Sequence, residues 1–139
     1  MFNCVSLKKY KNESYFTMYD IIIIGAGTAG ISAYKEAIKH TQNILIINDG
    51  PWDTTCARVG CMPSKVLISI ANRMHDIQHA GEVALRASTK IDTSQVMQHV
   101  RELRDHFTNA TLKEVNSWND HHKISGKAHF IDSKTVQVK

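Results

Sequence analysis

The stretch DIIIIGAGTAG, residues 20–30, decides the fold. After Asp20 come four isoleucines, which are typical of a strand buried on both faces, and glycines then interrupt the apolar run. Apolar residues at helical spacing follow over residues 29–38, and NILIIN, residues 43–48, returns to the composition of a buried strand. A strand, a helix and a second strand in this order predict a parallel βαβ unit.

The glycines satisfy the pattern G-x-G-x-x-G between the expected strand and helix, a context typical of dinucleotide binding. Gly25 permits the tight turn, Gly27 lets a pyrophosphate approach the backbone, and Gly30 allows the helix to pack closely on the strand. Together with Thr28 and Ala29, the turn offers free amide donors and the positive end of a helix dipole. A glycine-rich turn without a ligand is the alternative, and the flanking elements favour the dinucleotide site.

Such a site normally has an acidic residue at the end of the second strand, where it binds the ribose hydroxyls. This sequence has Asn48 at that position, followed by Asp49. The Asn48 amide can hydrogen-bond a ribose hydroxyl, but without charge assistance we expect the contact to be weaker by about 1 kcal/mol. Asp49 could take this role if the turn shifts by one residue.

The composition limits the class of protein. A chain of 139 residues with 42% apolar residues predicts one modest domain. Its 17 basic and 13 acidic side chains are scattered, so nucleic-acid binding is not expected. The longest aliphatic run is too short for a membrane span, and the N-terminus lacks the pattern of a secretory signal, so we expect a cytoplasmic protein that does not bind membranes. Three cysteines in a reducing compartment favour a catalytic over a structural disulfide.

The remaining segments can be assigned by periodicity. Residues 1–18 follow neither period, and we expect a disordered N-terminal extension ahead of a domain over residues 19–139. Two helices are predicted, one reaching about residue 79 and a longer one ending near residue 118. Their apolar stripes, expected in the core, are Val66, Ile70, Met74 and Ile77, and Val96, Val100, Leu103, Phe107 and Ala110. The alternating tail KISGKAHFI, DSK, TVQVK predicts a hairpin.

Two cysteines lie in DTTCARVGCMPSK, residues 53–65. A disulfide needs Cα atoms about 4.4–6.8 Å apart, whereas five residues of straight helix rise about 7.5 Å, so a regular helix through Cys56 and Cys61 cannot hold the bond. Pro63 favours a distorted turn that leads into a helix, whose N-terminus and Lys65 would favour the Cys61 thiolate. Zinc ligands and two buried thiols are alternatives, but the spacing is atypical of zinc, and the upstream glycine turn favours a redox pair.

At this point GAGTAG and TTCARVGCMPSK together resemble the pyridine nucleotide-disulfide oxidoreductases, most nearly their dihydrolipoamide dehydrogenase branch. The C-x4-C-x-P-S-K pattern is specific, and the resemblance spans residues 19–139. It implies a partial Rossmann-like FAD-binding domain of the α/β class. The elements of that domain would be a parallel βαβ unit, a redox helix, a long helix and a C-terminal β-hairpin.

The resemblance also implies roles for individual residues. Cys56 resembles the interchange thiol that meets a dithiol or disulfide substrate, and Cys61 resembles the thiol next to the flavin. Lys65 resembles the lysine beside the flavin ring, and Thr55 resembles a contact to the flavin nucleotide. Ala128 in GKAHF matches a position whose backbone contacts the adenine side. The pyrophosphate at the glycine turn would then belong to FAD.

Complete members of the family are homodimers several times longer, with an NAD domain and a C-terminal domain that supplies the acid-base histidine. The resemblance therefore implies the N-terminal segment of an enzyme that passes electrons from a dithiol through FAD to NAD, truncated and inactive by itself. Asn48 replaces the usual acidic residue and Asp53 stands where the family generally has glycine, so we expect weakened FAD binding. A non-enzymatic residual nucleotide-binding or interaction module is the alternative.

Two of the eight histidines are placed so that they could bind a metal. His75 and His79 lie four residues apart on a predicted helix. Without a third ligand in view, surface histidines are the better interpretation, and we expect no metal site. His121 and His122 are expected to be loop residues.

Overall fold

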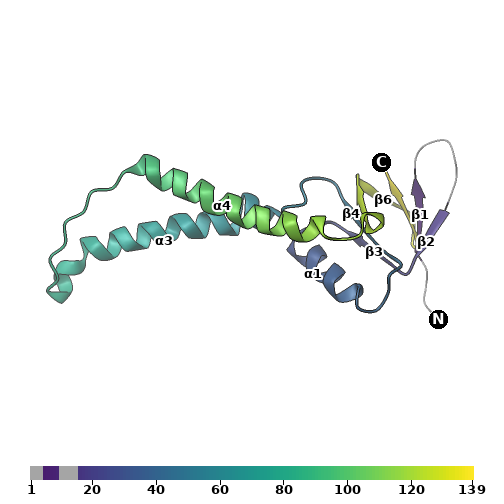
Figure 1. The fold of residues 1–139 in the computed structure, drawn as a ribbon, viewed down its shortest axis with the longest axis horizontal. Helices are drawn as coiled ribbons and strands as arrows, with labels where there is room; N and C mark the ends of the chain where they lie inside the picture. The colour runs from purple at the N-terminus through teal and green to yellow at the C-terminus, as the bar shows by residue number, and fades with distance from the viewer. Residues whose placement is uncertain (1–4, 10–15) are drawn as a thin grey trace. The chain divides into compact units, whose positions relative to one another are not determined.

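The computed structural model describes residues 5–9 and 16–139. The chain divides into two units, where its length suggested a single domain. The first combines residues 1–54 with residues 112–139, and the second comprises residues 55–111. Both sheets belong to the first unit, and two helices with most of a third belong to the second (Figure 1).

A parallel three-stranded sheet forms the core of the first unit. It contains β3 (Ile21–Ile24), β4 (Ile44–Asn48) and β5 (Lys123–Ser125) in the order β3-β4-β5. The helix α1 (Thr28–Ala37) connects β3 to β4, which confirms the predicted βαβ unit (Figure 1). β4 is the central strand, and its side chains Ile44–Ile47 are almost completely buried, as its continuous apolar run requires.

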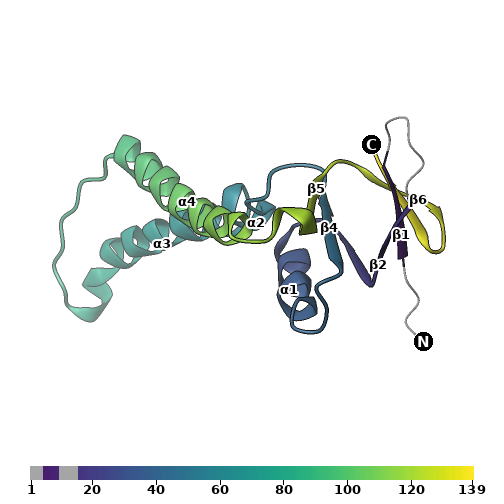
Figure 2. The ribbon, with the colours of Figure 1, turned by 45° about the vertical axis from the view of Figure 1, so that its right-hand side comes forward.

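A second sheet has four strands in the order β2-β1-β7-β6 (Figure 2). β6 (Ala128–Asp132) and β7 (Thr135–Val138) form the predicted hairpin. β1 (Val5–Lys9) pairs parallel with β7 and antiparallel with β2 (Phe16–Tyr19). These two strands differ from the expected disordered extension. That expectation rested on the absence of a side-chain period, whereas the strands are held by main-chain pairing, in part with a strand at the other end of the chain. The rest of that segment lies outside the described residues.

Gly126 divides the alternating tail between the two sheets. Its φ is +154°, and a Cβ there would lie 2.5 Å from Val138 Cγ1 and 2.7 Å from the carbonyl oxygen of Lys139. The Gly126 N–H donates to the carbonyl oxygen of Asn48 at 2.9 Å, and β6 begins two residues later. The segment KISGKAHFI, expected as one strand, is therefore two strands, since glycine allows a change of sheet that alternation does not reveal.

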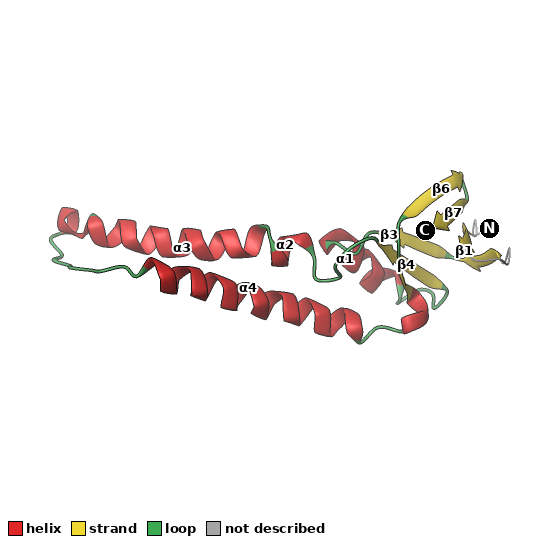
Figure 3. Cartoon of the chain, turned by 90° about the horizontal axis from the view of Figure 1, so that it is seen from above, coloured by secondary structure: helices red, strands yellow, loops and turns green. Residues whose placement is uncertain are grey.

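The second unit is helical. A single turn, α2 (Thr55–Arg58), precedes α3 (Cys61–Gln78), and α4 (Thr93–Asn116) runs back antiparallel to α3 (Figure 3). Both predicted helices are confirmed, but their stripes are less buried than expected. α3 has no fully buried side chain, and of the α4 stripe only Val100 is fully buried. No helix in the described part of the chain is both long and apolar enough to cross a bilayer.

Candidate functional site

The glycine turn between β3 and α1 has the predicted geometry. Gly25 has φ +96°, a left-handed conformation that favours glycine. A Cβ on Gly30 would lie only 1.9 Å from the carbonyl oxygen of Gly25, so this position requires glycine. No atom lies within 4 Å of a Cβ built on Gly27, so the backbone there is open to a ligand. The tight turn and the close helix packing are confirmed, and phosphate binding at Gly27 stays a prediction.

The N-terminus of α1 is suited to an anion. Its N-cap residue, Gly27, offers no side-chain cap, and the first turn contains no acidic residue. The N–H groups of Thr28 and Ala29 have no acceptor within an α-helix, because they belong to its first turn. Both residues are exposed. A pyrophosphate fits this cradle, since the free donors and the helix dipole both favour negative charge.

Asn48 joins the glycine turn to the loop that follows β4. Its Oδ1 accepts a hydrogen bond from the Ala26 N–H at 3.0 Å. Its Nδ2 donates to the carbonyl oxygens of Gly50 at 2.9 Å and Pro51 at 3.1 Å. The amide predicted to hold a ribose is therefore already engaged, whereas the neighbouring Asp49 is exposed. Sequence reasoning missed this linking role, although an Asn followed by Asp-Gly-Pro is a known loop-forming signal.

The loop before the cysteines contains one strained residue. Thr54 has φ +61°, which a β-branched residue rarely adopts, and its side chain is buried. Asp53 is also buried but has no positive φ. The backbone strain of this loop therefore lies at Thr54 and not at Asp53, which stands where the family generally has glycine. A left-handed non-glycine residue costs about 1–3 kcal/mol and is most often found near functional sites.

Cys56 and Cys61 lie on either side of a helix break. Cys56 is in α2, and Cys61 is the first residue of α3. Between them Gly60 has φ −119° and ψ −113°, outside helical values, and a Cβ there would approach the Thr55 carbonyl oxygen to 3.1 Å. The predicted distorted turn into a helix is confirmed. Gly60 itself was missed, although a glycine just before Cys61 is a signal for such a break.

The two cysteines are free thiols in contact with each other. The hydrogen bond between their side chains raises the pKa of Cys56, and partial burial and the negative charge of Cys61 act in the same direction. The Cys61 N–H, at the start of α3, and the charge of Lys65 oppose this shift without reversing it. The raised pKa means that Cys56 holds its proton more firmly than an ordinary thiol does.

The other predicted site residues are divided between the units. Lys65 lies in the second turn of α3 and is exposed, and Thr55 opens α2 with its side chain exposed. Ala128 is the first residue of β6, where it pairs with Val138. The glycine turn, Asn48 and Ala128 thus belong to the first unit, and the cysteines, Thr55 and Lys65 belong to the second.

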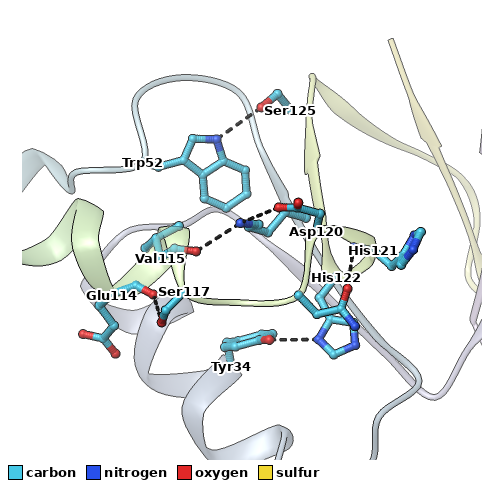
Figure 4. Close-up of polar contacts among 11 residues, drawn as sticks. Tyr34, Trp52, Glu114, Val115, Ser117, Asp120, His121, His122 and Ser125 are labelled. Atoms are coloured by element: carbon cyan, nitrogen blue, oxygen red, sulfur yellow. Dashed lines mark hydrogen bonds and ion pairs between the residues drawn. The ribbon is translucent and has the colours of Figure 1, made fainter.

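A buried polar cluster supports α1 from the opposite end of the chain (Figure 4). The Tyr34 hydroxyl lies 2.8 Å from His122 Nδ1. The Tyr34 ring also stacks on Trp118 with centroids 4.0 Å apart. Burial raises the pKa of Tyr34, so its hydroxyl keeps the proton. Nearby, Lys123 Nζ donates to the Val115 carbonyl oxygen at 3.1 Å. His122 is only 6% exposed, so the expectation of a loop histidine was wrong: its partner Tyr34 lies 88 residues away in sequence.

Comparison with known proteins places this geometry in a family. The model of the pyridine nucleotide-disulphide oxidoreductases matches residues 19–139. The chain belongs to this family. Both the family and the α/β fold class expected from the sequence are thereby confirmed.

Among pyridine nucleotide-disulphide oxidoreductases, the chain is 33% identical over 122 residues to dihydrolipoyl dehydrogenase of Mycoplasma genitalium, covering 86% of this chain and 26% of the relative. It is 28% identical over 121 residues to mercuric reductase of Lysinibacillus sphaericus, covering 86% and 22%. The chain therefore spans about a quarter of the length of the curated relatives it matches.

Solved structures show the same fold. The Cu(II) complex of the HOCl-induced flavoprotein disulfide reductase RclA from Escherichia coli superposes with a TM-score of 0.61 at 22% identity, over 85% of this chain and 24% of that one. LpdA from Mycobacterium tuberculosis has a TM-score of 0.57 at 23% identity, over 81% and 24%. At this level of identity the similarity concerns the fold alone.

Proposed function

We propose that this chain provides the FAD-binding turn and the redox cysteines of a flavoprotein disulfide reductase of the dihydrolipoamide dehydrogenase type. The observation that carries the proposal is the contact between Cys56 and Cys61 across the helix break at Gly60. The two thiols are five residues apart in sequence, and the helix break lets them touch, as a redox pair requires. Membership of the family supports the same reading.

FAD fits the first unit through its pyrophosphate. The residues that would hold it are Gly25, Gly27, Thr28, Ala29 and Gly30, with open space above Gly27. Because the Asn48 amide is engaged by the loop, Asp49 is the better candidate for the ribose hydroxyls, while Asn48 positions the turn. Thr55, Lys65 and Ala128 are proposed as further contacts to the nucleotide, the flavin and the adenine. When bound, FAD would supply a two-electron acceptor for the reduced cysteine pair.

The cysteines would carry out thiol–disulfide exchange. In the oxidised pair, a substrate thiolate attacks Cys56 Sγ, the Cys56–Cys61 bond breaks, and Cys61 leaves as a thiolate. The second substrate thiol, after losing its proton, displaces Cys56, so the substrate becomes a disulfide and the protein pair becomes a dithiol. The substrate loses two electrons and the pair gains them. The raised pKa of Cys56 suits this outcome, since Cys56, released as a thiolate, takes up a proton more readily than an ordinary thiolate does.

The reaction of the whole enzyme is proposed for a longer protein. NAD binding, homodimerisation and dithiol-to-NAD turnover are family properties, and the chain spans about a quarter of the relatives it matches. We expect the 139 residues alone to have negligible dihydrolipoamide:NAD activity. A cytoplasmic location likewise stays a prediction from the sequence pattern.

The proposal can be tested on the cysteine pair. The purified chain is equilibrated in oxidised and reduced dithiothreitol and analysed by mass spectrometry. We expect an intramolecular Cys56–Cys61 disulfide that Cys4→Ser leaves intact and that Cys56→Ser or Cys61→Ser removes. If oxidation never joins Cys56 to Cys61, the redox role is wrong. In a separate measurement, a flavin spectrum that persists through gel filtration supports the FAD site.

The non-enzymatic alternative rests on exposed apolar side chains. Leu67 and Ile68 on α3 are 43% and 56% exposed, more than a helix in a closed core would show. A product that is colourless and forms no Cys56–Cys61 disulfide, yet retains another protein through this helix, would favour an interaction module. Substituting Leu67 and Ile68 with serine would then abolish that retention.

A further inference from the structure

A groove lies between α3 and α4 in the helical unit. The two helices run antiparallel (Figure 3), and the space between them has a volume of about 280 Å³. Its floor consists of half-buried apolar side chains, which are Met62, Val66 and Ile70 on α3 and Leu103 and Phe107 on α4. All but Met62 belong to the two apolar stripes that the sequence predicts for the core. The groove therefore lies where these stripes are incompletely covered.

The polar side chains along the rim give the groove a positive charge. Lys65, Ser69, Arg73 and His99 line it and are exposed to solvent. Among the described residues, none of those that line the groove is acidic. A ligand that buries an apolar body on the floor and keeps a negative group at the rim complements this arrangement.

The two ends of the groove differ in their hydrogen-bond donors. Arg73 is the last lining residue on α3 and His99 is the first on α4, so both mark the same end of this antiparallel pair. The Arg73 guanidinium matches the geometry of a carboxylate, and the His99 ring can donate a further N–H. Lys65, near the other end, offers a single strongly hydrated ammonium. The end with Arg73 and His99 is therefore the better site for an anionic head group.

We propose that the groove binds one aliphatic carboxylate, with its head group at Arg73 and His99 and its chain along the apolar floor. From Met62 to Arg73 the groove follows 11 residues of α3, or about 16 Å along the helix axis. Its volume lies just below the usual range of about 300–1,000 Å³ for ligand pockets, which suits a single slender chain rather than a bulky ring system. The chain would end at Met62, the residue after Cys61. This site goes beyond the proposed redox function, which needs no such ligand.

The test titrates the full chain with octanoate, decanoate and octanol below their aggregation limits and follows binding by NMR chemical shifts. Circular dichroism confirms that each variant is folded. Decanoate should bind about 15-fold more tightly than octanoate, because each buried CH₂ contributes about fourfold. Arg73→Gln should weaken octanoate binding about fivefold, the upper end for an exposed ion pair, and should leave the binding of uncharged octanol unchanged. Arg101→Gln is the matched control, because Arg101 is exposed on α4 and does not line the groove.

A second pair of variants tests the groove itself. Ser69→Trp fills it from an exposed position and should abolish binding, whereas Asn72→Trp adds the same ring to an exposed residue of α3 outside the groove and should not. The proposal is overturned if neither carboxylate binds the folded chain, if Arg73→Gln weakens octanol as much as octanoate, or if Ser69→Trp binds like the parent. Binding to anionic vesicles without binding of dissolved decanoate would also overturn it. No arm of the experiment needs FAD or a disulfide, so its failure is distinguishable from a failure of the redox role.

Discussion

Adding one methyl group at Gly30 should destabilise the fold. A Cβ there would lie 1.9 Å from the Gly25 carbonyl oxygen, and contacts below 3.0 Å are essentially never observed, so the turn or α1 must move by about 1.1 Å. The same movement disturbs the Gly25 N–H, which donates to the Ile47 carbonyl oxygen at 2.7 Å. Overpacking costs about 3 kcal/mol, and the better helix propensity of alanine returns about 1 kcal/mol. We expect Gly30→Ala to lower the free energy of unfolding by about 2 kcal/mol.

Gly27→Ala is the matched control, because the same methyl group there enters open space. Gly27 has φ −72°, which alanine adopts without strain, and no atom lies within 4 Å of the added carbon. Its stability should stay within about 0.5 kcal/mol of the parent chain. The methyl group would, however, occupy the position from which a pyrophosphate approaches the backbone. Gly27→Ala should therefore weaken FAD binding without changing stability.

Urea unfolding followed by circular dichroism measures the first effect, and quenching of FAD fluorescence measures the second. Both variants and the parent chain are compared at the same protein concentration. Equal stability of Gly30→Ala and the parent would refute the close helix packing. Unchanged FAD affinity in a stable Gly27→Ala variant would refute the approach of the pyrophosphate at this residue.

Three further predictions concern the surroundings of the site. Asn48→Ala removes the bonds to Ala26, Gly50 and Pro51 and should cost about 1–2 kcal/mol in urea unfolding, whereas unchanged stability would contradict the linking role. Tyr34→Phe keeps the stacking on Trp118 but leaves His122 Nδ1 without its partner, so thermal unfolding should report a loss of about 1–2 kcal/mol. Cys61→Ala removes the hydrogen bond that raises the pKa of Cys56, so Cys56 should ionise at a lower pH in this variant. The alkylation rate of Cys56 should therefore rise at a lower pH than in the reduced parent chain. An unshifted pH profile of alkylation would exclude the thiol contact.

Much of the local structure could be predicted because its causes lie within a few residues. The glycine turn follows from steric limits at Gly25 and Gly30, which are the same in any chain with this spacing. The break between α2 and α3 could be predicted from the short Cα separation that a disulfide requires and from Pro63, which lies in the first turn of α3. Helical periodicity also placed α3 and α4 correctly. It overestimated their burial, because a periodic stripe indicates which face is apolar but not how much of it is covered.

Other features depend on partners that are distant in sequence. β1 pairs with β7 through backbone groups, and these carry no side-chain pattern. His122 is buried next to Tyr34, its hydrogen-bond partner, which lies 88 residues away in sequence. Asn48 and Thr54 likewise owe their roles to the path of one loop, which residue type alone does not specify.

The sequence by itself determined the βαβ unit, the glycine turn, the cysteine pair and the family, since each depends on residue types at short spacings. Only the tertiary structure decided which residues surround that chemistry. It showed that the Asn48 amide is engaged, that the strain lies at Thr54, that the tail divides between two sheets at Gly126, and that contact with Cys61 raises the pKa of Cys56. The physical reason is that hydrogen bonds, burial and pKa values depend on atoms that folding brings together.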